Sequence, residues 1–224
     1  MRFAGVVFLG LVIATGSASA QSEAPEIPPR VRALELFRQG NLKEAIPELQ
    51  KSLQKNSADA EVRLHLAFAY DRLGSADEAI AEYRRVTEIQ PNSYFAHNNL
   101  GVIYDKQGRY DDAIAAFESA GRIDPNNTGA KTNLATARKN KAAVQERQAQ
   151  IQKVEDAAAI NPKDPKASFN AARMHAHYGN RAEALQWLDR ARRQGYKDLA
   201  SVKNDPSFKS LTNDRDFELI LVGK

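Results

Sequence analysis

The sequence predicts an all-α protein in which helix–turn–helix pairs stack into a solenoid with C-terminal capping helices. Small residues recur every 34 positions in two series, which are Gly40, Gly74 and Gly108, and Ala45, Ala79 and Ala113. A period of this length is typical of stacked helical units rather than of one compact core. The chain has no Cys, so neither a disulfide framework nor thiolate chemistry is expected.

Residues 94–127 are the most complete copy of the repeat. One face of each helix follows a fixed spacing, given by Leu100, Gly101 and Tyr104 in the first helix and by Ala113, Phe117, Ala120 and the closing Pro125 in the second. This spacing resembles the tetratricopeptide repeat (TPR), a helix–turn–helix unit of 34 residues. The resemblance implies an α-solenoid that binds a protein or peptide partner without catalysis, and it leaves the partner unnamed.

Two further units precede this one at the same period. Residues 60–93 match it closely, with an aromatic residue, Tyr70, at the expected place. Residues 26–59 are a weaker copy, because Leu36 stands where the pattern has Tyr. Pro47 falls inside the second helix of that unit, where proline removes a hydrogen bond at a cost of up to roughly 3 kcal/mol. We therefore expect a bend there rather than the loss of the helix.

The chain begins with a segment that is typical of a secretory signal peptide. Residues 1–20 combine Arg2, an apolar run and the A-x-A pattern of Ala18-Ser19-Ala20. The run is shorter than the roughly 20 residues of a membrane-spanning helix, so we expect cleavage and no integral membrane segment afterwards; an uncleaved anchor is the alternative. Export to the periplasm is favoured over release from the cell. The Pro-rich residues 21–29 then form a linker.

The second helices of three units are predicted to begin at residues that favour N-caps. The pairs are Ser75 with Glu78, Asn41 with Glu44, and Asn180 with Glu183. The first pair is a capping box, and the others place an N-cap beside an acid in the first turn. These caps support the positions of the turns.

Residues 128–164 are a degenerate fourth unit, because Ala142 replaces the turn glycine. Either one long helix runs from about 130 to 159, or a tight turn near 140–144 keeps the pair; the abundance of strong helix formers favours the long helix. Apolar residues recur every seven positions in this segment, at Val144, Ile151 and Ala158, which resembles a coiled-coil seam. The other seam positions are polar: Lys141, Gln148 and Glu155. This stripe predicts at most weak self-association, and a self-associating structural protein joined through 130–159 is one alternative function.

The end of the chain closes the predicted solenoid. Residues 165–198 form a fifth, TPR-like unit in which His175 takes the place of Tyr. Residues 199–224 break the period, and Asp205 and Asp214 are expected to begin two short helices. A solenoid needs such a cap to cover its last apolar face.

Charge is unevenly distributed along a chain whose formal net charge is +4. Residues 165–224 carry 11 Lys and Arg against 7 Asp and Glu, an excess that solvated helix faces explain. The alternative is an anionic envelope polymer or assembly partner for the basic half, bound at a patch of Arg138, Lys139, Lys141 and Arg147. The chain has no nucleic-acid-binding motif, so nucleic acid is not an expected partner.

The sequence contains no motif for catalysis, for a cofactor or for a metal ion. His175 and His177 are two residues apart on a predicted helix, so they point to nearly opposite sides. The acidic pair Asp111-Asp112 lies in the first turn of a second helix, where it favours the helix dipole. We therefore expect no enzyme, no cofactor and no metal.

The resemblance implies a concave groove on the first helices of successive units. Ten residues are its candidates: His65, Phe68, Phe95, Asn98, Asn99, Val102, Asn133, Phe169, Asn170 and Arg173. The aromatic members favour an apolar side chain from the partner. The carboxylate clamp of chaperone-binding TPR proteins is not expected, because few of the matching positions suit it: Arg30, Leu34, His65, Phe95 and Asn99.

Asn99, Asn133 and Asn170 share one repeat position, which His65 takes in the second unit. An Asn amide both donates and accepts, so a row of them can bond an extended peptide backbone. The alternative is that Asn is simply common at this position in the family. The predicted function is a non-catalytic adaptor that captures an extended or helical segment in its groove.

Overall fold

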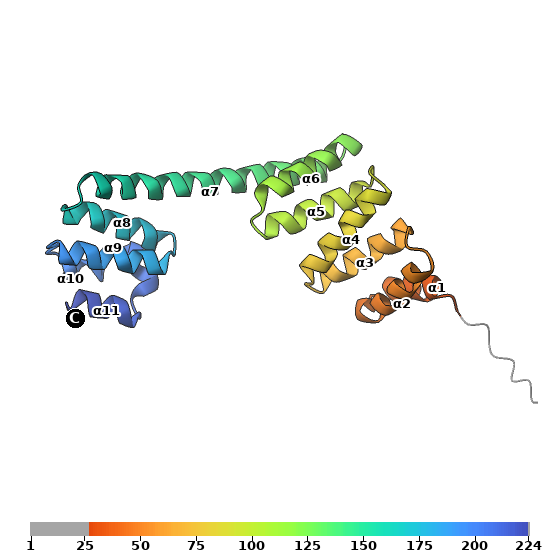
Figure 1. The fold of residues 1–224 in the computed structure, drawn as a ribbon, viewed down its shortest axis with the longest axis horizontal. Coiled ribbons are helices and arrows are strands. Elements are labelled where there is room, and N and C mark those ends of the chain that lie inside the picture. Colours follow the sequence, from red (N-terminus) through yellow and green to blue (C-terminus); the bar gives the residue numbers. More distant parts are fainter. Residues whose placement is uncertain (1–26, 224) are drawn as a thin grey trace, which may run out of the picture.

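A computed structural model describes residues 27–223, and within this range every regular element is a helix (Figure 1). The all-α prediction is therefore confirmed for the described part of the chain. The expected signal peptide, residues 1–20, and most of the linker 21–29 lie outside the described residues.

Three helix pairs follow one another from the beginning of the described chain. They are α1 (Pro29–Arg38) with α2 (Leu42–Lys55), α3 (Ala60–Arg72) with α4 (Ala76–Ile89), and α5 (Tyr94–Lys106) with α6 (Tyr110–Ile123). The glycine in each turn has a positive φ, +79° at Gly40, +85° at Gly74 and +73° at Gly108. Glycine adopts this conformation without a steric penalty, which explains its 34-residue spacing. Pro47 lies inside α2, and the helix continues on both sides of it.

The N-cap positions predicted for the second helices are confirmed, but the side-chain capping hydrogen bonds expected there are not made. Asn41, Ser75 and Asn180 do occupy N-cap positions, but in the described structure their side chains accept no capping hydrogen bond. Backbone hydrogen bonds hold the turn instead. The Ser75 amide donates to the Tyr70 carbonyl at 2.9 Å, and Gly74 between them has a positive φ. Side-chain caps occur at the first helices, where Asp59 accepts from a first-turn amide at 3.1 Å.

The helix α7 (Thr128–Ile160) is a single helix of 33 residues, so the long-helix alternative is the one that the structure adopts. The remaining helices are α8 (Pro165–His177), α9 (Arg181–Arg193), α10 (Leu199–Val202), the 3-10 helix η1 (Pro206–Leu211) and α11 (Arg215–Leu221). Figure 1 shows two helix stacks at opposite ends of α7. We call α1–α6 with the first half of α7 the N-terminal stack, and the second half of α7 with α8–α11 the C-terminal stack.

One contact between helices recurs through the chain at a separation of 20 residues. It joins the second helix of one unit to the first helix of the next, in the pairs Gln50–Tyr70 (2.9 Å), Arg84–Tyr104 (3.0 Å), Glu118–Arg138 (2.8 Å) and Glu155–His175 (3.1 Å). Arg138 lies in the first half of α7 and Glu155 in the second half. The helix α7 therefore supplies both the first and the second helix of the fourth unit, joined end to end.

Each stack has its own buried core. In the N-terminal stack the largest buried side chains include Tyr83 and Phe117, which belong to one buried cluster with residues of α3, α5 and α7. A Cβ atom on Gly101 would lie 2.5 Å from the Phe117 ring, so only glycine fits there without movement. In the C-terminal stack Phe208 and Phe217 stack with their ring centres 5.5 Å apart.

The coiled-coil stripe predicted along α7 is not a free seam. Ile151 and Ala158 are buried where the second half of α7 packs on α8. Of the three apolar stripe positions, Val144 alone is exposed. The apolar residues that suggested self-association thus hold α8 within the chain.

Candidate functional site

The first helices α1, α3 and α5 form a groove of about 440 Å³ on the N-terminal stack. Its lining consists of Phe37, Leu64, His65, Phe68, Tyr94, Phe95, Asn98 and Asn99. We call it the aromatic groove. Five of the ten predicted groove residues lie in it together: His65, Phe68, Phe95, Asn98 and Asn99.

Aromatic side chains dominate this lining. The Phe37 ring meets the rings of His65 and Phe68 edge-on, at centre distances of 4.5 and 5.6 Å. Phe95 packs edge-on against Tyr94 and still exposes 64% of its surface, while Phe68 exposes 38%. Large apolar side chains gathered in a hollow and left exposed mark a surface for association.

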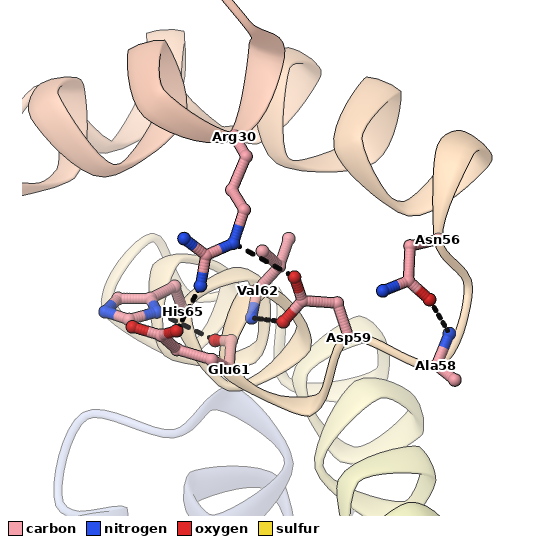
Figure 2. Close-up of polar contacts among 7 residues, drawn as sticks. All are labelled: Arg30, Asn56, Ala58, Asp59, Glu61, Val62 and His65. Carbon is pink, nitrogen blue, oxygen red and sulfur yellow. Dashed lines mark hydrogen bonds and ion pairs between the residues drawn. The ribbon is translucent and has the colours of Figure 1, made fainter.

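Hydrogen bonds fix the orientation of His65. Its Nδ1 donates to the Glu61 backbone carbonyl at 2.8 Å, as Figure 2 shows. A carbonyl can only accept, so the proton sits on Nδ1, and Nε2 is the polar atom that the ring has left for a ligand. His65 is thereby a positioned polar group in a largely aromatic lining.

The predicted row of asparagines is largely used inside the protein. The Asn99 amide donates to the Tyr83 hydroxyl at 2.9 Å, and the Asn133 amide donates to the Asn98 carbonyl oxygen at 3.1 Å. Burial raises the pKa of Tyr83 well above its usual range, against the lowering effect of the Asn99 hydrogen bond. These amides therefore lock neighbouring helices together, which restricts what they offer to a ligand.

Three other predicted residues do not join the aromatic groove. Phe169 is 9% exposed and stacks on Tyr196 at a ring distance of 4.3 Å, so it is a core residue of the C-terminal stack. Asn170 and Arg173 line a separate hollow of about 400 Å³ on that stack, where Arg173 pairs with Asp205 at 2.9 Å. The groove candidates of the two stacks therefore lie in two separate hollows, with the helix α7 between the stacks.

Val102 is half-buried against the core of the N-terminal stack, outside the lining of the aromatic groove. The lining also contains Phe37 and Tyr94, which the sequence analysis missed. Phe37 lies three residues after Leu34, a position already assigned to the concave face, so helical spacing could have found it. Tyr94 immediately precedes Phe95, and burial followed by the nearby Asp124 raises its pKa.

Comparison with known protein families decides what kind of protein this is. Three family models, each described as tetratricopeptide repeat, match residues 36–99, 94–127 and 135–198. The chain belongs to the tetratricopeptide repeat family. The match over 135–198 includes most of α7, so the fourth TPR unit is recognisable in sequence although its helices are fused.

Several solved structures are similar to this chain at low sequence identity. MamA from Desulfovibrio magneticus RS-1 is 18% identical, with 76% of this chain and 94% of that chain covered and a TM-score of 0.49. The second TPR domain of human RPAP3, solved with an HSP70 peptide, is 21% identical over 50% of this chain and 92% of its own, with a TM-score of 0.47. The Arabidopsis OM64 TPR domain gives the same four values. No curated protein matches the sequence.

The TPR carboxylate clamp was not expected here, and the geometry gives a further reason against it. Arg30 is the cation at the matching position, and its guanidinium is bound to Asp59 at 3.1 Å and to Glu61 (Figure 2). Both acids belong to the start of α3, so the pairs tie α1 to α3. A terminal carboxylate would have to compete with two carboxylates already in place.

The predicted basic patch on α7 is also partly neutralised. Arg138 pairs with Glu118 at 2.8 Å, and Lys141 pairs with Asp111. Arg147 lies over the Tyr178 ring, 5.1 Å from its centre, in a cation–π contact. These side chains connect the TPR helices to one another, so the patch offers an anion less than its sequence suggests.

Two further features of residues 27–223 concern metal binding and membrane insertion. Within this range no three His, Asp or Glu side chains gather where they could hold a metal ion. None of the helices described there has both the length and the apolar character of a membrane span.

Proposed function

We propose that the protein is a non-catalytic TPR scaffold that captures a segment of a partner protein in the aromatic groove. The observation that carries the proposal is Phe95, a phenylalanine that exposes 64% of its surface beside Phe68 inside a hollow. An exposed ring costs free energy in water unless a partner covers it, at about 25 cal/mol per Å² of apolar area. The tetratricopeptide repeats support a role as a protein-interaction scaffold.

The chemistry of the groove indicates what the bound segment carries. None of the groove residues in the described part of the chain is a Lys, Arg, Asp or Glu. The anchor is therefore an uncharged large side chain, aromatic or aliphatic, whose burial contributes about 1.5–3 kcal/mol. His65 Nε2 can accept, and the side-chain NH2 group of Asn98 can donate, a hydrogen bond to the backbone beside that anchor; the Asn98 oxygen already accepts from Asn133.

A displayed library of random 12-residue peptides, selected on the immobilised protein, tests the proposal. We expect the selected peptides to share one central Phe, Trp, Leu or Met and to lack an acidic C-terminus as a common feature. Their affinities are then measured by fluorescence anisotropy for the wild type, Phe95→Ala and Ile160→Ala. The control Ile160 is 77% exposed at the end of α7 and lies outside the groove.

The two variants distinguish binding in the aromatic groove from non-specific binding to exposed apolar side chains. Phe95→Ala removes a residue that scarcely contributes to the core, so we expect unchanged unfolding and at least about tenfold weaker peptide binding. Ile160→Ala should bind as the wild type does. Selected peptides that bind all three proteins equally, or a library that yields no apolar consensus, would contradict the proposal. Asn99→Ala is unsuitable as the main variant because Asn99 also bonds Tyr83.

We propose in addition that the protein is exported, with the periplasm as its location. Residues 1–20 support this by their apolar run and A-x-A pattern. The mature chain would begin at Gln21 and contain 224 less 20, or 204, residues. Intact-mass measurement of the protein from an envelope fraction tests this, and a chain that retains Met1 in the cytoplasmic fraction would contradict it.

A further inference from the structure

We propose that the fourth TPR unit is an open repeat, and that α7 can fold back near Ala142 so that its two halves pack as a helix pair. The two stacks would then join into one continuous superhelix. This inference concerns the conformation of α7 and holds whether or not the aromatic groove binds a peptide.

The first observation is that both halves of α7 keep their TPR positions. Arg138 meets Glu118 in the preceding unit, and Glu155 meets His175 in the following unit, each through the same 20-residue contact found elsewhere in the array. What the fourth unit lacks is the packing of its own two helices. In every other unit this pairing is more extensive than the packing between units.

The second observation is an unfilled packing position on the first half of α7. Ala67, Gly101 and Ala172 occupy this position in other units, and all three are buried. In the third unit the facing residue is Phe117, whose ring lies against Gly101. The equivalent residue of α7, Ala135, is exposed.

The residue that would fill this position is already in the chain. Glu155 corresponds to Glu118 through the shared 20-residue contact, so Val154 corresponds to Phe117. Val154 is half-buried, and folding α7 back would bring it over Ala135. An apolar side chain would then cover a small one, as in the other units.

The third observation concerns the connecting segment. All eight residues 142–149 are exposed, so the middle of α7 is covered by neither stack. The residues of the recurring contact measure the length of each turn region. Arg84 follows Tyr70 by 14 positions in the second unit, whereas Glu155 follows Arg138 by 17 positions in the fourth. The fourth unit has three more residues with which to turn, so it does not require the left-handed glycine that the shorter turns use.

Two opposing effects set the balance between the open and closed forms. The residues at 142–149 are mostly Ala, Gln, Glu and Arg, which favour the continuous helix. Packing of the two halves favours closure, as it does in the other units. A ligand that contacts both stacks would bind only one of the two forms and would shift the population toward it.

A distance measurement between two spin labels tests closure directly. The chain has no native Cys, so Lys131→Cys and Lys153→Cys give two specific labels on exposed sites of α7. In the straight helix the labelled residues are 22 positions apart, or about 33 Å. In a closed pair with helix axes about 8–10 Å apart, they come within about 20 Å. Pulsed electron paramagnetic resonance resolves these two distances.

A control pair and a designed turn complete the experiment. Lys153→Cys with Glu183→Cys places both labels on the C-terminal stack, so its distance should stay the same in both forms. Ala142→Gly with Ala143→Asn copies the natural turn Gly40-Asn41. We expect a minor short-distance population in the wild type and at least about a fivefold larger one in this variant, because Gly weakens the helix interior.

Two results would overturn the proposal. One is a wild-type distribution that contains only the long distance, whatever the variant shows. The other is a short distance that disappears when labelled protein is diluted with unlabelled protein, since that would reveal exchange between two copies. Because no peptide is present in these measurements, failure of the aromatic groove to bind would leave the expected distances unchanged.

Discussion

The concave surface formed by the first helices carries an exposed phenylalanine in the N-terminal stack and a buried one in the C-terminal stack. On the N-terminal stack Phe95 stays 64% exposed in the aromatic groove, whereas on the C-terminal stack Phe169 is 9% exposed. The segment after α9 makes the difference, because Tyr196 stacks on Phe169 with the ring centres 4.3 Å apart and Phe208 of η1 does so at 6.0 Å. One helical surface thus serves as a groove where the array stays open and as core where a cap folds onto it.

Removing the cap's aromatic contact should have the largest effect on this comparison. Phe208 is fully buried among Phe169 and Phe217, so Phe208→Ala should cost about 3–5 kcal/mol of unfolding free energy in the C-terminal stack. Urea unfolding followed by the fluorescence of Trp187, the single Trp of the chain, reports on this stack.

Far-ultraviolet circular dichroism of the same Phe208→Ala samples serves as the control. The N-terminal stack has a separate core, so its helices should unfold at the urea concentration found for the wild type. A single transition shifted equally in both signals would show instead that α7 couples the stacks into one cooperative unit.

A smaller loss is expected from a single methyl group in the N-terminal stack. Gly101→Ala places Cβ 2.5 Å from the Phe117 ring, and overpacking of this kind costs about 1–3 kcal/mol. The better helix propensity of Ala offsets up to about 1 kcal/mol of that loss. Thermal unfolding measures the sum. Trimming the ring in Gly101→Ala/Phe117→Leu should recover part of the loss; if Gly101→Ala stabilises the protein, the close approach is not restrictive.

Removing the Asn99 amide should cost still less, about 1 kcal/mol, because one hydrogen bond to Tyr83 is lost. A double-mutant cycle of Asn99→Ala with Tyr83→Phe measures this coupling by urea unfolding. The C-terminal counterpart Asn170 is exposed, so Asn170→Ala should leave stability unchanged. Equal losses at the two positions would contradict the assignment of Asn99 to the interior.

The periodic features of this fold were predictable because each unit repeats the same local physics. Gly74 and Gly108 mark turns that need a positive φ, and Phe117 marks the close packing of α6 on Gly101 of α5. Phe95 was recognised as a groove residue because its helix position alone places it on the concave face. In each case the information lies within one unit or its immediate neighbour.

What escaped prediction depends on partners far along the chain. Phe169 has the repeat position of a groove residue, but Tyr196, which follows α9, and Phe208, which lies in a non-repeating segment, both stack on it. The Asn99 amide faces either a ligand or Tyr83, and the repeat pattern does not distinguish these two. Ser75 and Glu78 match a capping box, but the Ser75 side chain accepts no capping hydrogen bond and the Ser75 amide donates to the Tyr70 carbonyl instead.

The smallest predicted effect concerns acid and the cap of the C-terminal stack. Hydrogen bonds from Arg181, including one of 3.0 Å from Nη2, hold the pKa of Asp214 below its usual 3.8, and the Phe217 and Asp216 amides add to this. A carboxyl whose pKa is lowered by folding stabilises the folded state above the unfolded-state pKa, and this stabilisation is lost as pH falls through the folded value. The stabilisation from Asp214 should therefore be lost only at pH values below about 4.

Nuclear magnetic resonance titration of the Asp214 carboxyl carbon measures this shift. Asp214 is half-buried but its partner Arg181 is exposed, so solvent screens the pair and keeps its effect on stability small. Arg181→Gln should raise the pKa of Asp214 toward its usual value while the backbone cap of α11 remains, since the Asp216 and Phe217 amides still donate to it at 2.9 and 3.1 Å. An unchanged pKa of Asp214 in Arg181→Gln would assign the shift to the two backbone amides alone. The ion pair would then contribute nothing to the stability of the C-terminal cap.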